Sequence, residues 1–186
     1  MELLFPRPPA PEPLKFGLLA DLGIITVPAD YVHSTQLASF KAKHQGGRKK
    51  SFAYFNDEAT DGNYMNPSRI LMPGDKLWVR AHKQVVSGTT TSDERMAFLA
   101  TLNSHHVGAQ GASLVFDQKR EQLPKGYWYA SMDVKEYLWK DAVGYHRVPV
   151  VSADSNGDFH FHLGSFGHPW YGSDAVLSFC DVPLET

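Results

Sequence analysis

The chain has 186 residues and a mass of 20.8 kDa, with 42% hydrophobic and 12% aromatic residues, which excludes a wholly disordered protein and is typical of one compact domain. The formal net charge of −2 and a pI near 6.5 argue against a general nucleic-acid binder, which is usually basic, and against electrostatic attachment to a membrane. The single cysteine, Cys180, excludes an intramolecular disulfide and a multi-cysteine zinc site.

The N-terminal segment predicts an extended arm. Residues 6–13 hold five of the chain's twelve prolines, which fix φ and lack an N–H donor. We therefore expect a Pro-rich arm at 1–13, with an SH3-type ligand as the alternative, followed by a single domain at 14–186. The chain does not start with a basic segment followed by a long apolar one, and it has no run of about eighteen apolar residues. The sequence thus predicts no signal peptide, no membrane insertion and, by default, a cytoplasmic protein.

The middle of the chain combines strand and helix patterns. In chain order, these patterns predict a short helix at 36–43, a strand at 51–55, a turn-rich loop at 56–67 and a strand at 76–81. Thr91 and Glu94 have the spacing of a capping box, which predicts the start of a helix. Another helix is predicted over 109–122, because Pro124 and Gly126 follow it.

From residue 126 onward the pattern becomes β-rich. Aromatic and β-branched runs predict strands at 127–132, 145–151 and 175–182. Between 158 and 163, Phe159, Phe161 and Leu163 alternate with polar residues, which is the period of two that a strand requires. Two principal helices followed by a β-rich C-terminal half place the chain in the α+β class.

The histidines of the tail suggest a metal site as one hypothesis. His160 and His162 lie two residues apart on a predicted strand, so both point to one face, as a pair of metal ligands requires. His168 and Asp158 are the candidates for further ligands. However, the segment after the pair lacks the acidic residue that a cupin-like site would place there. A metal-binding β domain or a metal-dependent enzyme that uses His160, His162 and His168 is therefore kept as the alternative function.

The composition of the tail points in another direction. The 37 residues from Val148 to Leu184 contain no Lys, Arg, Glu, Gln or Met, although these types account for 36 residues of the chain. His, Ser, Tyr, Asp and Gly stand between the apolar residues instead. All five arise from an asparagine codon by changes of its adenines. Lys, Glu, Gln and Met cannot arise in this way if the last base of the codon stays a pyrimidine.

Three stretches also resemble a known family. The run Gly108–Gly126, together with Trp128–Ser131 and Tyr145–Pro149, resembles the variable proteins of diversity-generating retroelements, and the resemblance extends over about 73–182. In that family, error-prone reverse transcription at adenines rewrites a C-terminal stretch of a C-type-lectin-like domain. The resemblance implies such a domain here, with a variable binding region at about 152–179. It also implies a non-enzymatic protein that recognises an unknown macromolecular ligand, most simply another protein.

On this interpretation the tail carries the ligand-binding residues. Histidine and aromatic rings would supply contact area, and Ser and Asp would supply adaptable hydrogen bonds, as in antibody loops. We expect no cofactor, and no calcium, because Asp174 and Asp181 alone do not form the oxygen cluster that this cation needs. The expected ligand-binding residues are Ser155, His160, His162, Ser165, His168, Trp170, Tyr171, Ser173 and Asp174.

Because side chains alternate between the two faces of a strand, the hypothesis predicts where the tail side chains lie. The polar tail residues from His160 to Ser173 should share one exposed patch, and Phe159, Phe161, Leu163 and Phe179 should lie beneath it. Substitution of His160 or His162 should then cost less than about 0.5 kcal/mol of stability, as at other surface positions. Glycines after Leu163 would let the chain turn, so the later polar residues need not follow the same alternation.

Overall fold

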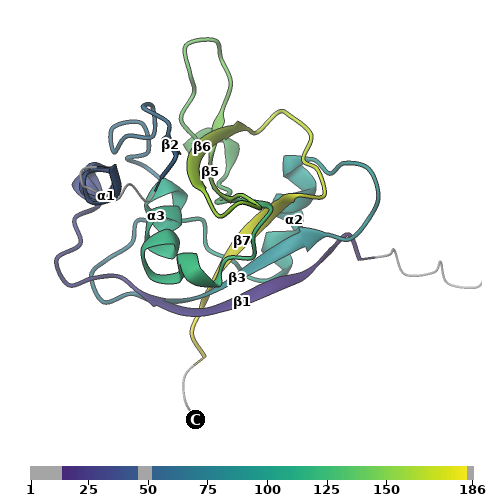
Figure 1. The fold of residues 1–186 in the computed structure, drawn as a ribbon, viewed down its shortest axis with the longest axis horizontal. Coiled ribbons are helices and arrows are strands. Elements are labelled where there is room, and N and C mark those ends of the chain that lie inside the picture. The colour runs from purple at the N-terminus through teal and green to yellow at the C-terminus, as the bar shows by residue number, and fades with distance from the viewer. Residues whose placement is uncertain (1–13, 46–51, 184–186) are drawn as a thin grey trace, which may run out of the picture.

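The computed structural model describes residues 14–45 and 52–183, which form a mixed α+β fold around a seven-stranded sheet (Figure 1). The strands are β1 (Phe16–Thr26), β2 (Tyr54–Phe55), β3 (Lys76–Gln84), β4 (Tyr127–Ala130), β5 (Arg147–Ala153), β6 (Phe159–Ser165) and β7 (Asp174–Asp181). The α-helices are α1 (Gln36–Gln45), α2 (Ser92–Thr101) and α3 (Gly108–Lys119). The predicted α+β class is confirmed, and the predicted arm at 1–13 lies outside the described residues.

The sheet has the strand order β1-β3-β7-β4-β5-β6-β2. Neighbouring strands are antiparallel except for two parallel pairs, β4 with β7 and β2 with β6. The last strand, β7, is thus inserted at the centre of the sheet between β3 and β4. The β-rich tail is therefore held on both sides by earlier parts of the chain, rather than added at one edge.

The helices cover the two faces of the sheet unequally. Figure 1 shows α1 and α3 on one side of the central strands and α2 on the other. Two groups of buried apolar side chains fill the α1/α3 side, and a smaller group lies on the α2 side. At the end of the α2 side formed by β4, β5, β6 and β2, Trp128 and Tyr54 remain 41% and 44% exposed. This end of the face is therefore open to solvent.

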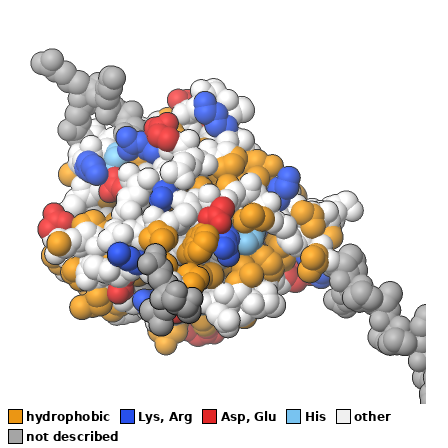
Figure 2. Space-filling model, turned by 90° about the horizontal axis from the view of Figure 1, so that it is seen from below, with side chains coloured by type: hydrophobic (Ala, Val, Ile, Leu, Met, Phe, Trp, Pro, Cys, Tyr) orange, Lys and Arg blue, Asp and Glu red, His pale blue; other side chains and the backbone are white. Residues whose placement is uncertain are grey.

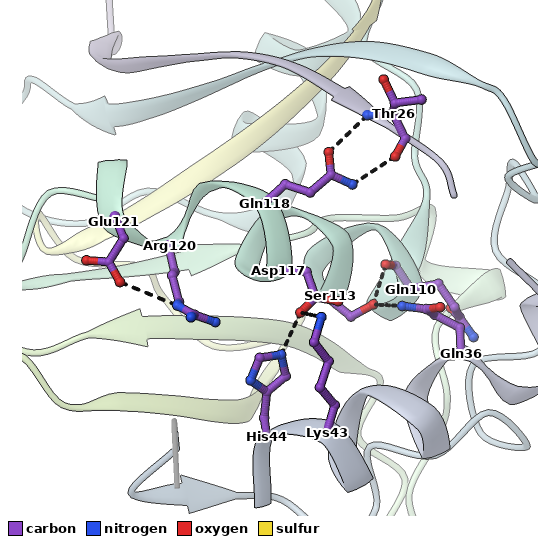
Figure 3. A network of polar contacts seen from close by, with 10 residues as sticks. All are labelled: Thr26, Gln36, Lys43, His44, Gln110, Ser113, Asp117, Gln118, Arg120 and Glu121. Atoms are coloured by element: carbon purple, nitrogen blue, oxygen red, sulfur yellow. Dashed lines mark hydrogen bonds and ion pairs between the residues drawn. The ribbon is translucent and has the colours of Figure 1, made fainter. Parts of the chain in front are cut away.

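Polar contacts fix α1 against α3 (Figure 3). His44, near the end of α1, is 3% exposed, and its Nε2 lies 2.5 Å from the Asp117 carboxylate of α3. Lys43 Nζ donates to the same carboxylate at 3.0 Å, and Gln36 Nε2 donates to the Ser113 hydroxyl at the other end of α1. Because α1 is held at both ends, it forms a fixed wall for the aromatic core behind β6.

The free edge of β1 is protected against pairing with another strand. Its register with β3 shifts twice, and Gly23, beside one shift, has a φ of +70°, a conformation that favours glycine. Asp21 accepts hydrogen bonds from Trp78 Nε1 at 2.6 Å and from Arg80 Nε at 3.2 Å. Figure 2, which views the molecule from below the view of Figure 1, shows hydrophobic side chains interrupted by charged ones. Bulges and charges of this kind are typical of protected edges.

The structure confirms most predicted elements and corrects three of them. The capping box of α2 is present, since Thr91 Oγ1 accepts from Glu94 N and Glu94 Oε2 accepts from Thr91 N. The short helix predicted at 36–43 is confirmed as α1, which buries Leu37 and Phe40 against the aromatic core. The described residues therefore contain three α-helices where two principal ones were expected. The helix expected over 109–122 ends as α3 at Lys119 and continues as a 3-10 turn.

The third correction concerns the strand expected at 51–55, which is reduced in the described residues to the two residues of β2. Such a short strand holds its place through its parallel pairing with β6 and through burial of Phe55. None of the helices in the described residues is both long and apolar enough to cross a membrane.

Candidate functional site

β6 divides its side chains between the two faces of the sheet. Phe161 is fully buried, and its ring lies 4.9 Å from that of Phe55 in a stacked arrangement on the α1/α3 side. His160 and His162 alternate with it and are only partly buried. The expected alternation is therefore confirmed for these residues, with the phenylalanine in the core and the histidines on the opposite face.

His162 lies within a row of rings on the open end of the sheet. Its ring is stacked on Trp128 of β4, with centroids 4.6 Å apart, and on Tyr54 of β2, with centroids 5.1 Å apart. His160 lies beside it at 5.2 Å. We refer to Trp128, His162 and Tyr54 as the aromatic row. The row joins one tail residue to two residues that lie outside the tail.

The strand register explains how the row forms. Trp128 is paired with Ser152 of β5, Ser152 with His160, and His160 with Tyr54, so all four side chains project from one face. Ser152 is the small residue of this set and is fully buried, which leaves room above it for the larger rings. Its Oγ and the Nε2 of His162 are buried without a hydrogen-bond partner among the described residues. One polar atom of the row and one beneath it thus lack a hydrogen-bond partner among the described residues.

The electrostatics of the two histidines differ. His160 Nε2 lies 3.2 Å from the Asp154 carboxylate at the start of the β5–β6 turn. Burial, together with the neighbouring His160, lowers the pKa of His162 below its usual range, and Asp154 opposes this shift only in part. At neutral pH, His162 is therefore a neutral aromatic ring stacked on Trp128 and Tyr54, with its Nε2 buried.

The segment 166–174 between β6 and β7, which we call the recognition loop, lies on the same face. A Cβ on Gly164, the next residue of β6 on the His162 side, would come within 3.1 Å of Trp170 Cη2. His168, Tyr171 and Ser173 of this loop are exposed. The carbonyl of Ser173 accepts a hydrogen bond from Trp128 N at 3.0 Å, which connects the loop to the aromatic row.

A hollow of about 350 Å³ separates the recognition loop from the first turn of α2. Its walls are Thr91, Ser92, Asp93, Lys135, Phe166, Gly167, His168 and Pro169. Tail residues and residues outside the tail therefore share this hollow, as they share the aromatic row.

Two of the expected ligand-binding residues are not exposed. Ser165 and Trp170 are each only 6% exposed, so the prediction that Ser165 belongs to the exposed patch is wrong. Ser165 has the opposite parity to Gly164 and therefore points away from the histidine face. Trp170 packs over Gly164, and its Nε1 donates to Ser92 Oγ at 2.8 Å. Trp170 therefore anchors the loop from within, and the Ser165 Oγ is buried without a hydrogen-bond partner among the described residues.

The remaining expected residues occupy several positions. Asp174 is half-buried, and its carboxylate accepts from Tyr171 N at 2.6 Å, so it stabilises the turn at the end of the loop. Ser155 is exposed in the β5–β6 turn. Phe159 and Leu163 are partly buried and pack against the aromatic core behind β6, as expected. Phe179 is buried in a different apolar cluster, opposite Val79 of β3. His160 and His162 thus project from the open face of the sheet, and His168, Tyr171 and Ser173 are exposed in the recognition loop beside it.

Trp128 and Tyr54 were not among the residues expected at the site. Their contribution depends on strand order, since β4 and β2 meet the β6 histidines only through long-range pairing. For Trp128 the sequence did hold a signal. The residue stands between Tyr127 and Tyr129 in a predicted strand, so its side chain must face the side of the sheet opposite to theirs. Tyr54 had no comparable signal.

The three histidines of the alternative metal hypothesis do not converge. His168 lies beside Tyr145, at a ring distance of 5.6 Å, whereas His160 and His162 lie next to the aromatic row. Within residues 14–45 and 52–183, no group of three or more His, Cys, Asp or Glu side chains is arranged to hold a metal ion. His160 and His162, with the Asp154 carboxylate beside His160, do not form such a group.

Comparison with models of known protein families, with curated proteins and with solved structures gave no match to this chain.

Proposed function

We propose that this chain is a non-enzymatic recognition protein that binds another macromolecule, most simply a protein, through the β6 histidine face and the recognition loop. We further propose that its fold is C-type-lectin-like, and that the surface is diversified by adenine-directed mutagenesis from a retroelement. The ligand would contact His160, His162, His168, Tyr171 and Ser173, with Trp128 and Tyr54 as walls outside the tail.

The observation that carries this proposal is the division of labour along β6. Phe161 belongs to the aromatic core, whereas His160 and His162 have no role in that core. A surface that tolerates exchange needs such a rigid support, with outward side chains that the fold does not require. Exposed aromatic rings and small polar groups also supply contact area at low entropic cost, as in antibody paratopes.

The codon argument supports the same division. The exposed tail residues of the proposed site are His, Tyr and Ser, which all arise from an asparagine codon by changes at adenines. The tryptophan codon ends in a purine, so it cannot arise in this way, and Trp170 is buried. The exposed residues are thus of the types that such mutagenesis produces, and the anchoring tryptophan is not.

The gene's surroundings provide the test. We expect a reverse-transcriptase gene nearby and a near-copy of the 3′ end of this gene. The differences between the two copies should coincide with adenines of that copy and should include the codons of His160, His162 and His168. A neighbourhood with neither a reverse transcriptase nor a near-copy contradicts the diversification proposal. Stoichiometric zinc, iron or manganese in the natively purified protein would instead favour the metal hypothesis.

A further inference from the structure

Arg95 of α2 is a fully buried cation whose polar contacts lead to the recognition loop. Its Nη1 donates to the backbone carbonyl of Asp174 at 2.7 Å, and its Nε donates to Thr90 Oγ1 at 3.1 Å. Its Nη2 has no hydrogen-bond partner among the described residues. A buried charge is costly unless its surroundings compensate it, so its presence here requires an explanation.

Two aromatic rings provide part of the compensation. The guanidinium carbon lies 5.2 Å from the centroid of Trp170 and 5.6 Å from that of Phe16, both within the range of cation–π attraction. Burial lowers the pKa of Arg95 to about 10, and the nearby Asp174 charge opposes this shift. The guanidinium is therefore still charged at neutral pH, and Trp170 is one of the groups that stabilise it.

Trp170 and Asp174, the two loop residues beside Arg95, are also points at which the recognition loop is attached to the rest of the chain. Trp170 exchanges backbone hydrogen bonds with Thr90, from Trp170 N to Thr90 O at 2.8 Å and from Thr90 N to Trp170 O at 2.9 Å. Ser92 accepts from Trp170 Nε1 and donates to the Phe166 carbonyl at 2.6 Å. Thr90 and Ser92 thus fix the start and middle of the loop, and Arg95 fixes its end at Asp174.

The exposed residues of the loop make none of these contacts. The side chains of His168, Tyr171 and Ser173 are absent from the attachments formed by Thr90, Ser92 and Arg95. The loop conformation therefore depends on the residues below it and not on the residues that it presents.

We propose that Arg95 is the positioning residue of the recognition loop: its buried guanidinium joins Thr90, Trp170 and Asp174, so that residues 167–169 and 171–173 can change without loss of the loop conformation. The description of these residues as ligand-contacting rests on the proposed function, whereas the attachment itself does not. The planar guanidinium is suited to this role because it can reach two acceptors and lie against a ring at once, which an ammonium group cannot do in the same geometry.

Amide hydrogen exchange of the intact chain tests the positioning role directly. In Arg95→Met, the amides of Thr90, Trp170 and Tyr171 should exchange at least about tenfold faster, because local opening of the loop becomes easier. Amides of β5 and β6, such as that of Phe161, should change less than about twofold. Arg120→Met is the matched control, since Arg120 also lies over an aromatic ring, Phe116, but at the far end of α3. It should leave the loop amides unchanged.

Two more variants keep the test decisive. Arg95→Lys keeps the positive charge but loses the planar guanidinium with its several N–H donors, so the loop amides should exchange as fast as in Arg95→Met. Exchange as slow as in the unmodified chain would contradict the two-acceptor role. If Arg95→Met does not fold, Ser92→Ala removes another attachment and should speed exchange in the same loop. Equal acceleration at all amides, or none in the loop, would overturn the proposal. These exchange experiments use no ligand and do not depend on the proposed function. If the gene neighbourhood holds neither a reverse transcriptase nor a near-copy, the diversification proposal fails, and faster exchange of the loop amides in Arg95→Met still supports the positioning role.

Discussion

The two faces of β6 differ in what the fold demands of them. On the α1/α3 side, Phe161 is enclosed by the rings of Phe40, Phe52 and Phe55 at centroid distances of 4.9 to 6.3 Å. On the other side, His162 is partly buried in the aromatic row, and His160 contacts Asp154 at the surface. Side chains one residue apart thus contribute very differently to stability, which is the property that an exchangeable surface requires.

The α2 side of the sheet contains a second contrast, between two histidines. His82 of β3 lies under α2, where it is 6% exposed, contacts Ser178 Oγ at 3.0 Å and packs edge-on against Phe98. His162 lies on the same face beyond the reach of α2. The cover provided by α2 therefore separates a buried histidine, His82, from a partly exposed one, His162.

The largest expected effect is on the core side of β6. Phe161→Ala should lower the free energy of unfolding by about 3–5 kcal/mol, because a large cavity opens among rings that α1 and α3 hold in place. His160→Ala, one residue away, is the matched control and should change it by less than about 0.5 kcal/mol. Chemical denaturation of both variants measures the difference. Equal losses would show that the two faces do not differ.

The next effect is a pH dependence from His82. Burial, with a contribution from Arg80, lowers the pKa of His82 to about 4, below its ordinary value of 6.5. As the pH falls, His82 takes up a proton in the unfolded chain before it does so in the folded one. The free energy of unfolding is therefore unaffected by His82 above pH 6.5 and declines by on the order of 3 kcal/mol as the pH falls to 4. His82→Gln, which retains a partner for Ser178, should flatten this part of the profile. An unchanged profile between pH 6.5 and 4 would contradict the account of His82.

A smaller effect is expected at His162, and here the structure revises the sequence-based value. Stacking on Trp128 and Tyr54 adds to its half-burial, so His162→Ala should cost about 1 kcal/mol rather than less than 0.5. His162→Phe keeps the stacking and serves as the comparison, with a cost below that of alanine. The same denaturation experiments decide this point, and a loss above about 3 kcal/mol would place His162 among the residues that hold the fold.

The sequence predicted the local features well because they depend on neighbouring residues. The alternation of Phe161 with its flanking histidines and the capping box of α2 are both patterns within a few positions. Ser165 was assigned to the wrong face because the glycines after Leu163 were expected to turn the chain, whereas β6 continues with unbroken alternation to Ser165. The burial of Trp170 depends on distant α2 residues such as Ser92. Tyr54 was missed for the same reason, since only the pairing of β2 with β6 brings it to the site.

The central claim is that exposed tail positions can be exchanged and the tail positions beneath them cannot. Two libraries of the displayed chain test it, each with four codons randomised at the first two bases and fixed as cytosine at the third. One library varies His160, His168, Tyr171 and Ser173, and the other varies Phe161, Ser165, Phe166 and Asp174, so that every native residue can occur in its library. The folded fraction, measured as resistance to protease, should be at least about tenfold higher in the first library. Equal folded fractions in the two libraries would contradict the account.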